Sequence, residues 1–190
     1  MKIHLPLALV AGFLATPSLA VDASDAMGGF LDDNIVGWAS DAMILDAIRA
    51  QNAETAGLTQ AEIDAMDARW RAEVGTGATP TIDGVLKNPV SDMLRGHVDA
   101  MAGKVTEIFV MDARGLNVAS SAVTSDYWQG DEEKFSATAG VGPDARHFSE
   151  IEKDESTGSY QGQASFAITD PDTGAVIGAM TVGINAESLF

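Results

Sequence analysis

Cysteine is absent from this 190-residue chain. The absence excludes disulfide bonds, thiolate metal sites and thiol catalysis. Histidine is scarce as well, with three residues, of which His4 lies in an N-terminal apolar segment. His97 falls on the apolar face of an expected helix, where a lone histidine is more often a core residue than a ligand. We predict no metal site and no cofactor.

Basic residues are few, because 11 Lys and Arg stand against 28 Asp and Glu, for a net charge of −17. Such a surface repels nucleic acid and anionic lipid, so neither is an expected partner. The acidic runs 32–33 and 131–133 lack the alternating spacing of a calcium loop. They are interpreted as solvated surface or as favourable charge at helix N-termini.

Long apolar runs are missing beyond the N-terminus. Residues 5–15 are apolar, Pro17 ends the run, and Ser18-Leu19-Ala20 offers small residues for cleavage. This pattern predicts a signal peptide over residues 1–20, and hence a periplasmic or secreted protein without a membrane span. An uncleaved anchor is the alternative, but the run is shorter than the ~20 residues that a bilayer requires.

Catalytic signatures are also missing. The chain has no Gly-x-Ser-x-Gly elbow, no glycine-rich phosphate loop and no histidine–carboxylate metal motif. We therefore predict that the protein is not an enzyme.

Residues 21–104 show helical patterns. Apolar residues from Leu31 to Ile48 are spread through a proline-free stretch, which predicts one imperfectly amphipathic helix. Thr59 and Glu62 form a capping box that starts a helix running from Gln60 to about Val74. Residues 75–80 predict a loop, and Asn88 with a following proline starts another helix that stops at Gly103.

Residues 105–190 show strand patterns, over 105–111, 116–121, 162–169 and 175–184, with a tight turn at 170–174. In the first strand Val105, Phe109 and Met111 are predicted to point one way with Glu107 among them, while Ile108 and Val110 point the other way. Helices followed by strands predict one α+β domain over residues 21–190, with N-terminal helices packed on an antiparallel sheet.

The loop Asp126–Asp131 carries the strongest candidate site. Tyr127 and Trp128 are adjacent and are flanked by Asp126 and Asp131, a combination that suits a small or cationic ligand at a pocket mouth. The alternative is that Trp128 plugs the sheet edge while Asp131 caps the following helix.

The strand region resembles the Cache family of PAS-like extracytoplasmic sensor domains, in its single-domain form. The resemblance rests on residues 111–121, the Tyr127-Trp128 loop with its helix, and the segments 159–162 and 170–178. It implies a PAS-like sheet and a ligand held between the sheet and the loop and helix that cross it. The implied ligand-binding residues are Asp126, Tyr127, Trp128 and Gln129, with polar contributions from Ser120, Tyr160, Ser165 and Thr181.

The family's amino-acid-binding members place an arginine just before the aromatic pair, where this chain has Ser125 and Asp126. The departure favours a neutral or cationic ligand. The resemblance also implies a membrane sensor kinase or chemoreceptor as partner, because no output module follows the last strand. The expected function is a free-standing small-molecule sensor module. The alternative is a structural or protein-interaction domain whose pocket is filled by its own side chains.

Overall fold

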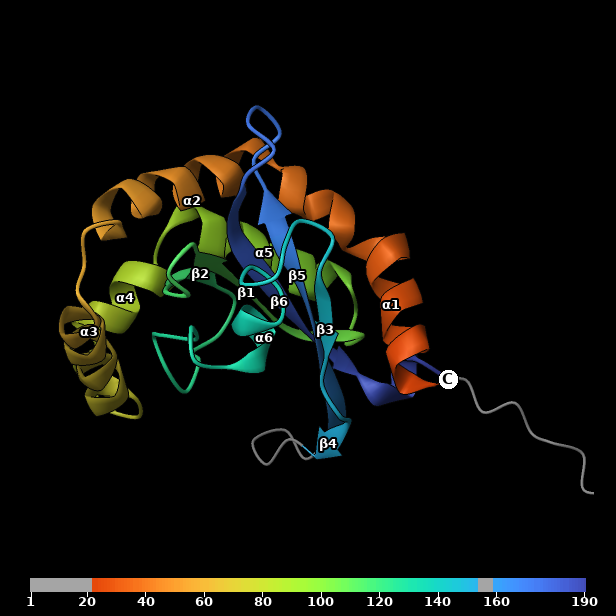
Figure 1. Cartoon of the computed structure of the whole chain (residues 1–190). Helices are drawn as coiled ribbons and strands as arrows, with labels where there is room; N and C mark the ends of the chain where they lie inside the picture. The colour runs from red at the N-terminus through yellow and green to blue at the C-terminus, as the bar shows by residue number, and fades with distance from the viewer. Residues whose placement is uncertain (1–21, 154–158) are drawn as a thin grey trace, which may run out of the picture.

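The computed structural model describes residues 22–153 and 159–190, so the predicted signal peptide lies outside the described residues. Helices gather around one antiparallel sheet, which confirms the α+β prediction (Figure 1). Within the described ranges no helix has the length and apolarity to cross a membrane. The elements are α1 (Ala23–Asn34), η1 (Val36–Ser40), α2 (Ala42–Thr55), α3 (Gln60–Glu73), α4 (Pro80–Leu86), α5 (Pro89–Ala100), β1 (Val105–Asp112), β2 (Asn117–Ser120), α6 (Glu133–Ser136), β3 (Arg146–Phe148), β4 (Glu152–Lys153), β5 (Tyr160–Thr169), β6 (Val176–Asn185) and η2 (Ala186–Ser188).

The sheet has the strand order β2-β1-β6-β5-β3, and β4 also pairs with β5. Helices α1, α2 and α5 cover one of its two sides, where they bury a continuous apolar core. The loop after β2 and the short α6 cross the other side (Figure 1). The two sides are called below the helix side and the loop side.

Alternation along β1 is largely as predicted. Ile108 and Val110 belong to the helix-side core, while Phe109 and Met111 form a small cluster on the loop side. The prediction for Val105 was wrong, since Val105 joins the helix-side core. The β1–β6 pairing shifts register between Val105 and Glu107, and such a bulge turns the residue before it to the opposite side.

Helix starts were predicted well where capping residues mark them. Thr59 and Glu62 form the expected capping box of α3, and the Asn88 side chain accepts from the amide of Ser91 at the start of α5. The single helix expected from Leu31 to Ile48 was wrong. Helix α1 ends at Asn34, and the Asp41 side chain accepts from the amide of Met43 to start α2 separately.

Four further elements escaped prediction, namely α4, β3, β4 and η2. Each is short, so its own sequence pattern is weak and packing decides its conformation. The predicted turn at 170–174 is present, with Gly174 at φ 72°. The Asp170 carboxylate accepts from the amide of Asp172 and from Arg49 Nε at 2.8 Å each, which ties the β5–β6 turn to α2.

A second apolar cluster lies beside β2. It joins α3 and α4 to the loop after β2 through Ile63, Trp70, Ile82, Leu116 and Tyr127. These helices therefore hold that loop in place from outside.

Candidate functional site

A cavity of about 120 Å³ lies between the loop side of the sheet and the segment that crosses it. Strands β1 and β5 supply its floor, and the segment 123–134 supplies its wall. Its lining residues are Glu107, Phe109, Val123, Thr124, Ser125, Gln129, Lys134 and Gln163. Most of these side chains are polar, in contrast to the core on the helix side.

The sheet presents an ordered row of side chains beneath this region. Phe109 pairs with Thr181, Thr181 with Ser165, and Ser165 with His147. Residues directly opposite one another in antiparallel strands share a side of the sheet, and Ser120 extends the row from β2. The Thr181 and Ser165 hydroxyls are buried and share a 2.9 Å hydrogen bond.

A second row contains Glu107, Gly183 and Gln163. Gln163 Nε2 donates to Glu107 Oε1 at 2.9 Å, so the bond spans the intervening strand β6. Gly183 permits it, because a Cβ there would come within 2.8 Å of Glu107 Cγ. Glycine thus leaves room for a carboxylate to lie flat across the sheet.

Gln129, which lines the cavity, holds a buried acceptor without a hydrogen-bond partner among the described residues. The residue is 1% exposed, and its Nε2 donates to the Asp126 carbonyl at 2.8 Å, which fixes the orientation of the amide. Among the described residues, its Oε1 has no hydrogen-bond partner. A buried acceptor without a donor costs about 1–3 kcal/mol, a cost that a bound donor would remove.

Lys134 projects from α6 to the cavity. Its ammonium lies 2.9 Å from Glu132 Oε2 and 5.5 Å from the centroid of the Phe109 ring. The side chain is only 15% exposed. The cavity therefore holds a positive charge from the chain itself, next to an aromatic face and a carboxylate.

Helix α3 positions the crossing loop through one buried acid. Asp67 Oδ1 accepts from the amides of Tyr127 and Trp128 at 2.9 and 3.1 Å, and Oδ2 pairs with Arg71 at 2.8 Å. Arg71 also reaches Asp126 at 3.3 Å. The backbone before Gln129 is thus fixed by contacts from a helix more than fifty residues earlier in the chain.

The aromatic pair points away from the cavity. Tyr127 stacks on Trp70 with ring centroids 5.6 Å apart, and its burial raises its pKa to about 12. Trp128 packs against the same cluster and donates through Nε1 to the Arg114 carbonyl at 2.8 Å. In this state both rings brace the loop.

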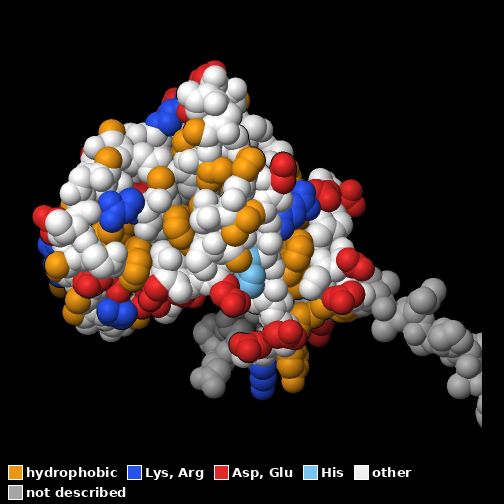
Figure 2. Space-filling view, in the orientation of Figure 1, with side chains coloured by type: hydrophobic (Ala, Val, Ile, Leu, Met, Phe, Trp, Pro, Cys, Tyr) orange, Lys and Arg blue, Asp and Glu red, His pale blue; other side chains and the backbone are white. Residues whose placement is uncertain are grey.

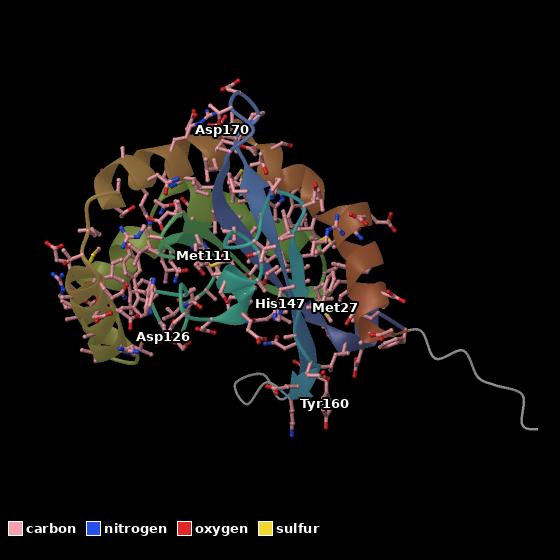
Figure 3. The ribbon with its side chains drawn as sticks, in the orientation of Figure 1. Met27, Met111, Asp126, His147, Tyr160 and Asp170 are labelled. Atoms are coloured by element: carbon pink, nitrogen blue, oxygen red, sulfur yellow. The ribbon has the colours of Figure 1, made fainter. Side chains whose placement is uncertain are left out.

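The remaining predicted residues are dispersed. Ser165, Thr181 and Ser120 share the loop side of the sheet, as described, and the Ser120 hydroxyl donates to the Ala122 carbonyl. Tyr160 is 58% exposed near β4, and Figure 3 shows it far from Asp126.

Asp131 is exposed and lines a hollow of about 400 Å³ next to the cavity, together with His147 and Lys134. Figure 2 shows a histidine on this face above a group of acidic side chains. The alternative role of Asp131 as a helix cap was wrong, since Glu132 takes the cap position of α6.

Sequence reasoning missed the positioning residue Asp67 and seven of the eight lining residues, namely Glu107, Phe109, Val123, Thr124, Ser125, Lys134 and Gln163. One signal was available in the sequence: Glu107 interrupts the apolar pattern of its strand. Pairing with Gln163 depends on which strand lies between them, and the sequence pattern alone does not give that order.

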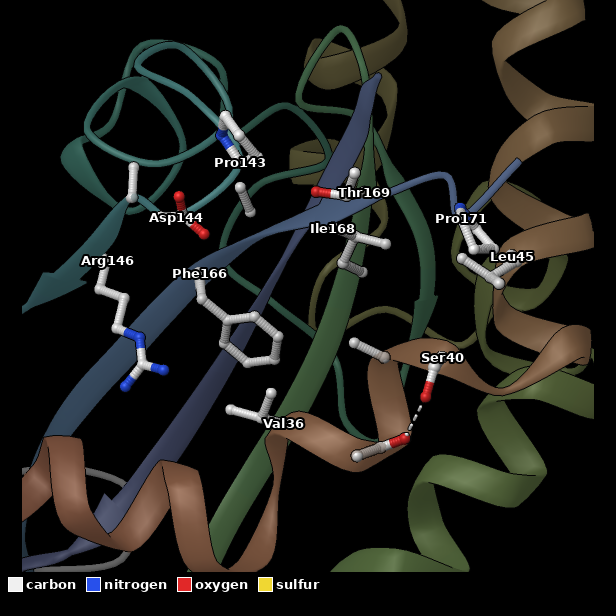
Figure 4. Close-up of a pocket in the computed structure, with 14 residues that line it drawn as sticks. Val36, Ser40, Leu45, Pro143, Asp144, Arg146, Phe166, Ile168, Thr169 and Pro171 are labelled. Atoms are coloured by element: carbon white, nitrogen blue, oxygen red, sulfur yellow. Dashed lines mark hydrogen bonds between the residues drawn. The ribbon is translucent and has the colours of Figure 1, made fainter. Parts of the chain in front are cut away.

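A larger cavity of about 450 Å³ lies between η1, the start of β3 and the end of β5 (Figure 4). Val36, Leu45, Phe166 and Ile168 contribute apolar surface, and Arg146 beside it is paired with Asp32. Within residues 22–153 and 159–190, no buried polar atom without a partner belongs to its lining. Because specific sites need convergent polar groups, the smaller, polar cavity is the stronger candidate.

Comparison with known proteins finds similarity only to solved structures, at low sequence identity. No protein-family model and no curated protein matches the sequence. Among solved structures, the chain is similar to the sensor domain of the Vibrio cholerae histidine kinase DctB, with 11% identity, a TM-score of 0.42, and coverage of 87% of this chain and 55% of that one. The sensory domain of the Campylobacter jejuni chemoreceptor Tlp3 gives 12% identity, a TM-score of 0.41, and coverage of 87% and 64%.

The extracellular domain of a putative histidine kinase, rpHK1S-Z16, gives 18% identity, a TM-score of 0.43, and coverage of 53% and 42%. This chain therefore spans between 42% and 64% of the length of these three structures. The neighbours are sensor domains of kinases and chemoreceptors, and likeness at this level establishes no function for this chain.

Proposed function

We propose that the protein is a small-molecule-binding module of the Cache type, exported from the cytoplasm, whose ligand occupies the polar cavity on the loop side of the sheet. The observation that carries the proposal is Gln129, a residue of the cavity lining whose buried Oε1 has no hydrogen-bond partner among the described residues. A ligand that donates a hydrogen bond would complete it.

The character of the ligand follows from the groups around the cavity. The unserved atom is an acceptor, and Glu107 adds a carboxylate whose only hydrogen bond within the described ranges comes from Gln163. Lys134 is already paired with Glu132. Acceptors thus outnumber free donors, which supports a neutral or cationic ligand.

The size of the ligand is limited in the present conformation. Pockets for drug-sized molecules measure about 300–1,000 Å³, whereas this cavity measures about 120 Å³. The hollow beside it shares Lys134 and Gln163 with the cavity. A ligand with few heavy atoms would fit the cavity, and a longer one would extend towards His147.

Signal output is proposed from the sequence resemblance alone. Cache-type domains relay ligand binding to membrane sensor kinases or chemoreceptors, and we propose such a protein as the partner. In this role the module binds its ligand and performs no catalysis.

A second candidate is a structural or interaction domain with a self-filled pocket. Phe109, Met111 and Ala179 form a cluster on the loop side, and Phe135 and Ala139 of the crossing segment pack against it. The chain therefore fills much of this side with its own side chains and leaves open the cavity at Glu107 and the hollow beside it.

Thermal-shift screening separates the two functions. Amines, polyols, amino acids and organic acids are tested on the chain from residue 21 onward, and a true ligand at a hundred times its dissociation constant stabilises the fold by about 2.7 kcal/mol. We expect stabilisation by at least one amine or neutral polar compound, and its loss in Glu107→Gln. The matched control Glu187→Gln removes an exposed acid at η2 and should bind normally. No stabilisation by any compound would favour the self-filled pocket.

A further inference from the structure

We propose that Lys134 is a built-in competitor for a cationic ligand: its ammonium occupies the cation position of the cavity, and a ligand amine displaces it. The inference rests on the proposed function, since it concerns the same cavity, and it specifies the ligand as a small ammonium compound.

The surroundings of the Lys134 ammonium are those of a cation-binding site. An aromatic face and a carboxylate converge on it, at 5.5 Å from the Phe109 centroid and 2.9 Å from Glu132. Cations bind over aromatic faces at such distances, more strongly when shielded from water. The side chain is 15% exposed, against 72% for Lys87 on the surface, and buried lysines are rare unless their charge is matched.

In its present position the Lys134 ammonium does not bond to every acceptor of the cavity lining. An ammonium has three donor hydrogens, and Lys134 makes one ion pair within the described part of the chain, with Glu132. Gln129 Oε1 has no donor, and Glu107 receives only the neutral amide of Gln163. The lysine is tethered to α6, whereas a free amine can change its position in the cavity that Glu107 and Gln129 both line. A ligand can therefore make contacts that the tethered ammonium does not make.

Moving the Lys134 side chain out of the cavity should cost little free energy. Helix α6 spans four residues, Glu133–Ser136, and no side chain caps its N-terminus. The partner Glu132 is 37% exposed, so its carboxylate stays in contact with water when Lys134 leaves. The long stem can swing towards the acidic hollow lined by Asp131 and Glu133, where the ammonium stays solvated near negative charge.

Affinity should therefore rise when the competitor is removed. A site that is mostly occupied by its own side chain binds with a dissociation constant raised by the inverse of the free fraction. Lys134→Met keeps the apolar stem and removes the ammonium, so we expect about tenfold tighter binding of a small amine. The control Lys104→Met makes the same charge change at an exposed residue before β1 and should alter affinity less than twofold.

The test uses isothermal titration of ethylammonium and ethanolamine, with acetate as an anionic probe, on the wild type and both variants. Tighter amine binding in Lys134→Met alone supports the inference. Unchanged or weaker amine binding overturns it. If acetate binds the wild type and is lost in Lys134→Met, Lys134 is instead a recognition group for an anion, and the inference also fails while a ligand-binding function stands. If neither the wild type nor Lys134→Met binds any probe or screened compound, the proposed function fails together with the inference.

Nuclear magnetic resonance gives a readout on the unmodified chain. The ammonium of Lys134 lies 5.5 Å from the Phe109 ring centroid, so we expect the ring to shift the signal of the neighbouring Hε protons. That signal is assigned by its loss in Lys134→Met. Saturation with ethylammonium should move this signal towards the position of a solvated lysine. A signal that stays at its ring-shifted position while ethylammonium binds would contradict displacement.

Discussion

The two sides of the sheet differ although the same strands build both. On the helix side, Ile108 and Val182 are fully buried among apolar side chains of α1, α2 and α5. One residue along each strand, Phe109 and Thr181 face the loop side, where a small apolar cluster lies beside buried hydroxyls and a polar cavity. Alternation along a strand thus separates stability from recognition, so substitutions one residue apart should have different effects.

The largest effect on stability is expected from Ile108→Ala. Ile108 is 0% exposed, and deleting a buried aliphatic side chain of this size costs about 2–5 kcal/mol through lost transfer free energy and a residual cavity. Urea unfolding measures the loss. Ligand affinity of the folded protein should stay within twofold, and a large affinity loss at full folding would break the division between the two sides.

High pH probes whether Tyr127 belongs to the stabilising framework. Its pKa is raised from 10.0 to about 12, first by burial and then by the charges of Asp112 and Glu54. The folded state thus favours the neutral phenol. The stabilisation is complete below pH 10 and is lost as the pH rises through 12, by about 2–3 kcal/mol in total.

Unfolding free energies between pH 9 and 12 measure this loss in the wild type and in Tyr127→Phe. The variant lacks the ionisable phenol, so its stability should fall less steeply over the window. Equal slopes in the two proteins would mean that Tyr127 titrates in contact with solvent.

Asp67→Ala tests the hydrogen bonds by which α3 holds the loop before Gln129, and these bonds should affect both stability and ligand binding. The change leaves the amides of Tyr127 and Trp128 without their acceptor and should cost about 1.5–3 kcal/mol, the range for hydrogen bonds to charged groups. Ligand affinity should fall too, because Gln129 follows these residues directly. Asp67→Asn retains an oxygen acceptor and should be milder in both assays; an equally severe Asn variant would point to charge alone.

A smaller change in stability is expected from Gly183→Ala on the loop side. The new methyl group would crowd Glu107 Cγ and Thr106 Oγ1, neither of which is the free end of a flexible side chain. We expect a cost of about 1–2 kcal/mol from overpacking, together with a clear loss of amine binding as Glu107 leaves its position. Calorimetry on the folded variant measures the affinity. Unchanged amine binding in this variant would mean that Glu107 is not a ligand-binding residue.

Acid sensitivity of the β5–β6 turn should be the weakest effect. The pKa of Asp170 is lowered from 3.8 to about 2, first by the hydrogen bond from Arg49 and next by that from the Asp172 amide. This contribution is present above about pH 4 and is lost as the pH falls through 2. Melting temperatures from pH 5 to 2 should decline less in Asp170→Asn than in the wild type. Parallel declines would indicate that the ion pair contributes nothing measurable.

The sequence predicts the fold better than the site, for a physical reason. Capping at Thr59 and Asn88 and alternation at Ile108 and Phe109 are local signals, and the structure confirms them. The break at Asp41 was also local but was hidden by continuing apolar residues. The bulge that turns Val105 depends on pairing with β6, which no single segment records.

The candidate site depends on such non-local contacts throughout. Gln129 was named as a site residue through the family resemblance, and it lines the cavity. The aromatic rings themselves face α3, because Trp70 and Asp67 hold them there. Glu107 and Gln163 meet only across β6. Contact of a ligand with Tyr127, Trp128 or Tyr160 stays a prediction.

The central claim, that the loop side of the sheet binds a small amine, is tested most directly by the side-chain amide resonances of Gln129 and Gln163. These are assigned by their loss in Gln129→Glu and Gln163→Glu. Titration of ethanolamine should shift both signals along one saturable curve, while the methyl signals of Ile108 and Val182 on the helix side stay in place. Saturable shifts confined to Phe166 and Ile168, which line the larger cavity on the helix side, or no shifts at either glutamine, would contradict the account.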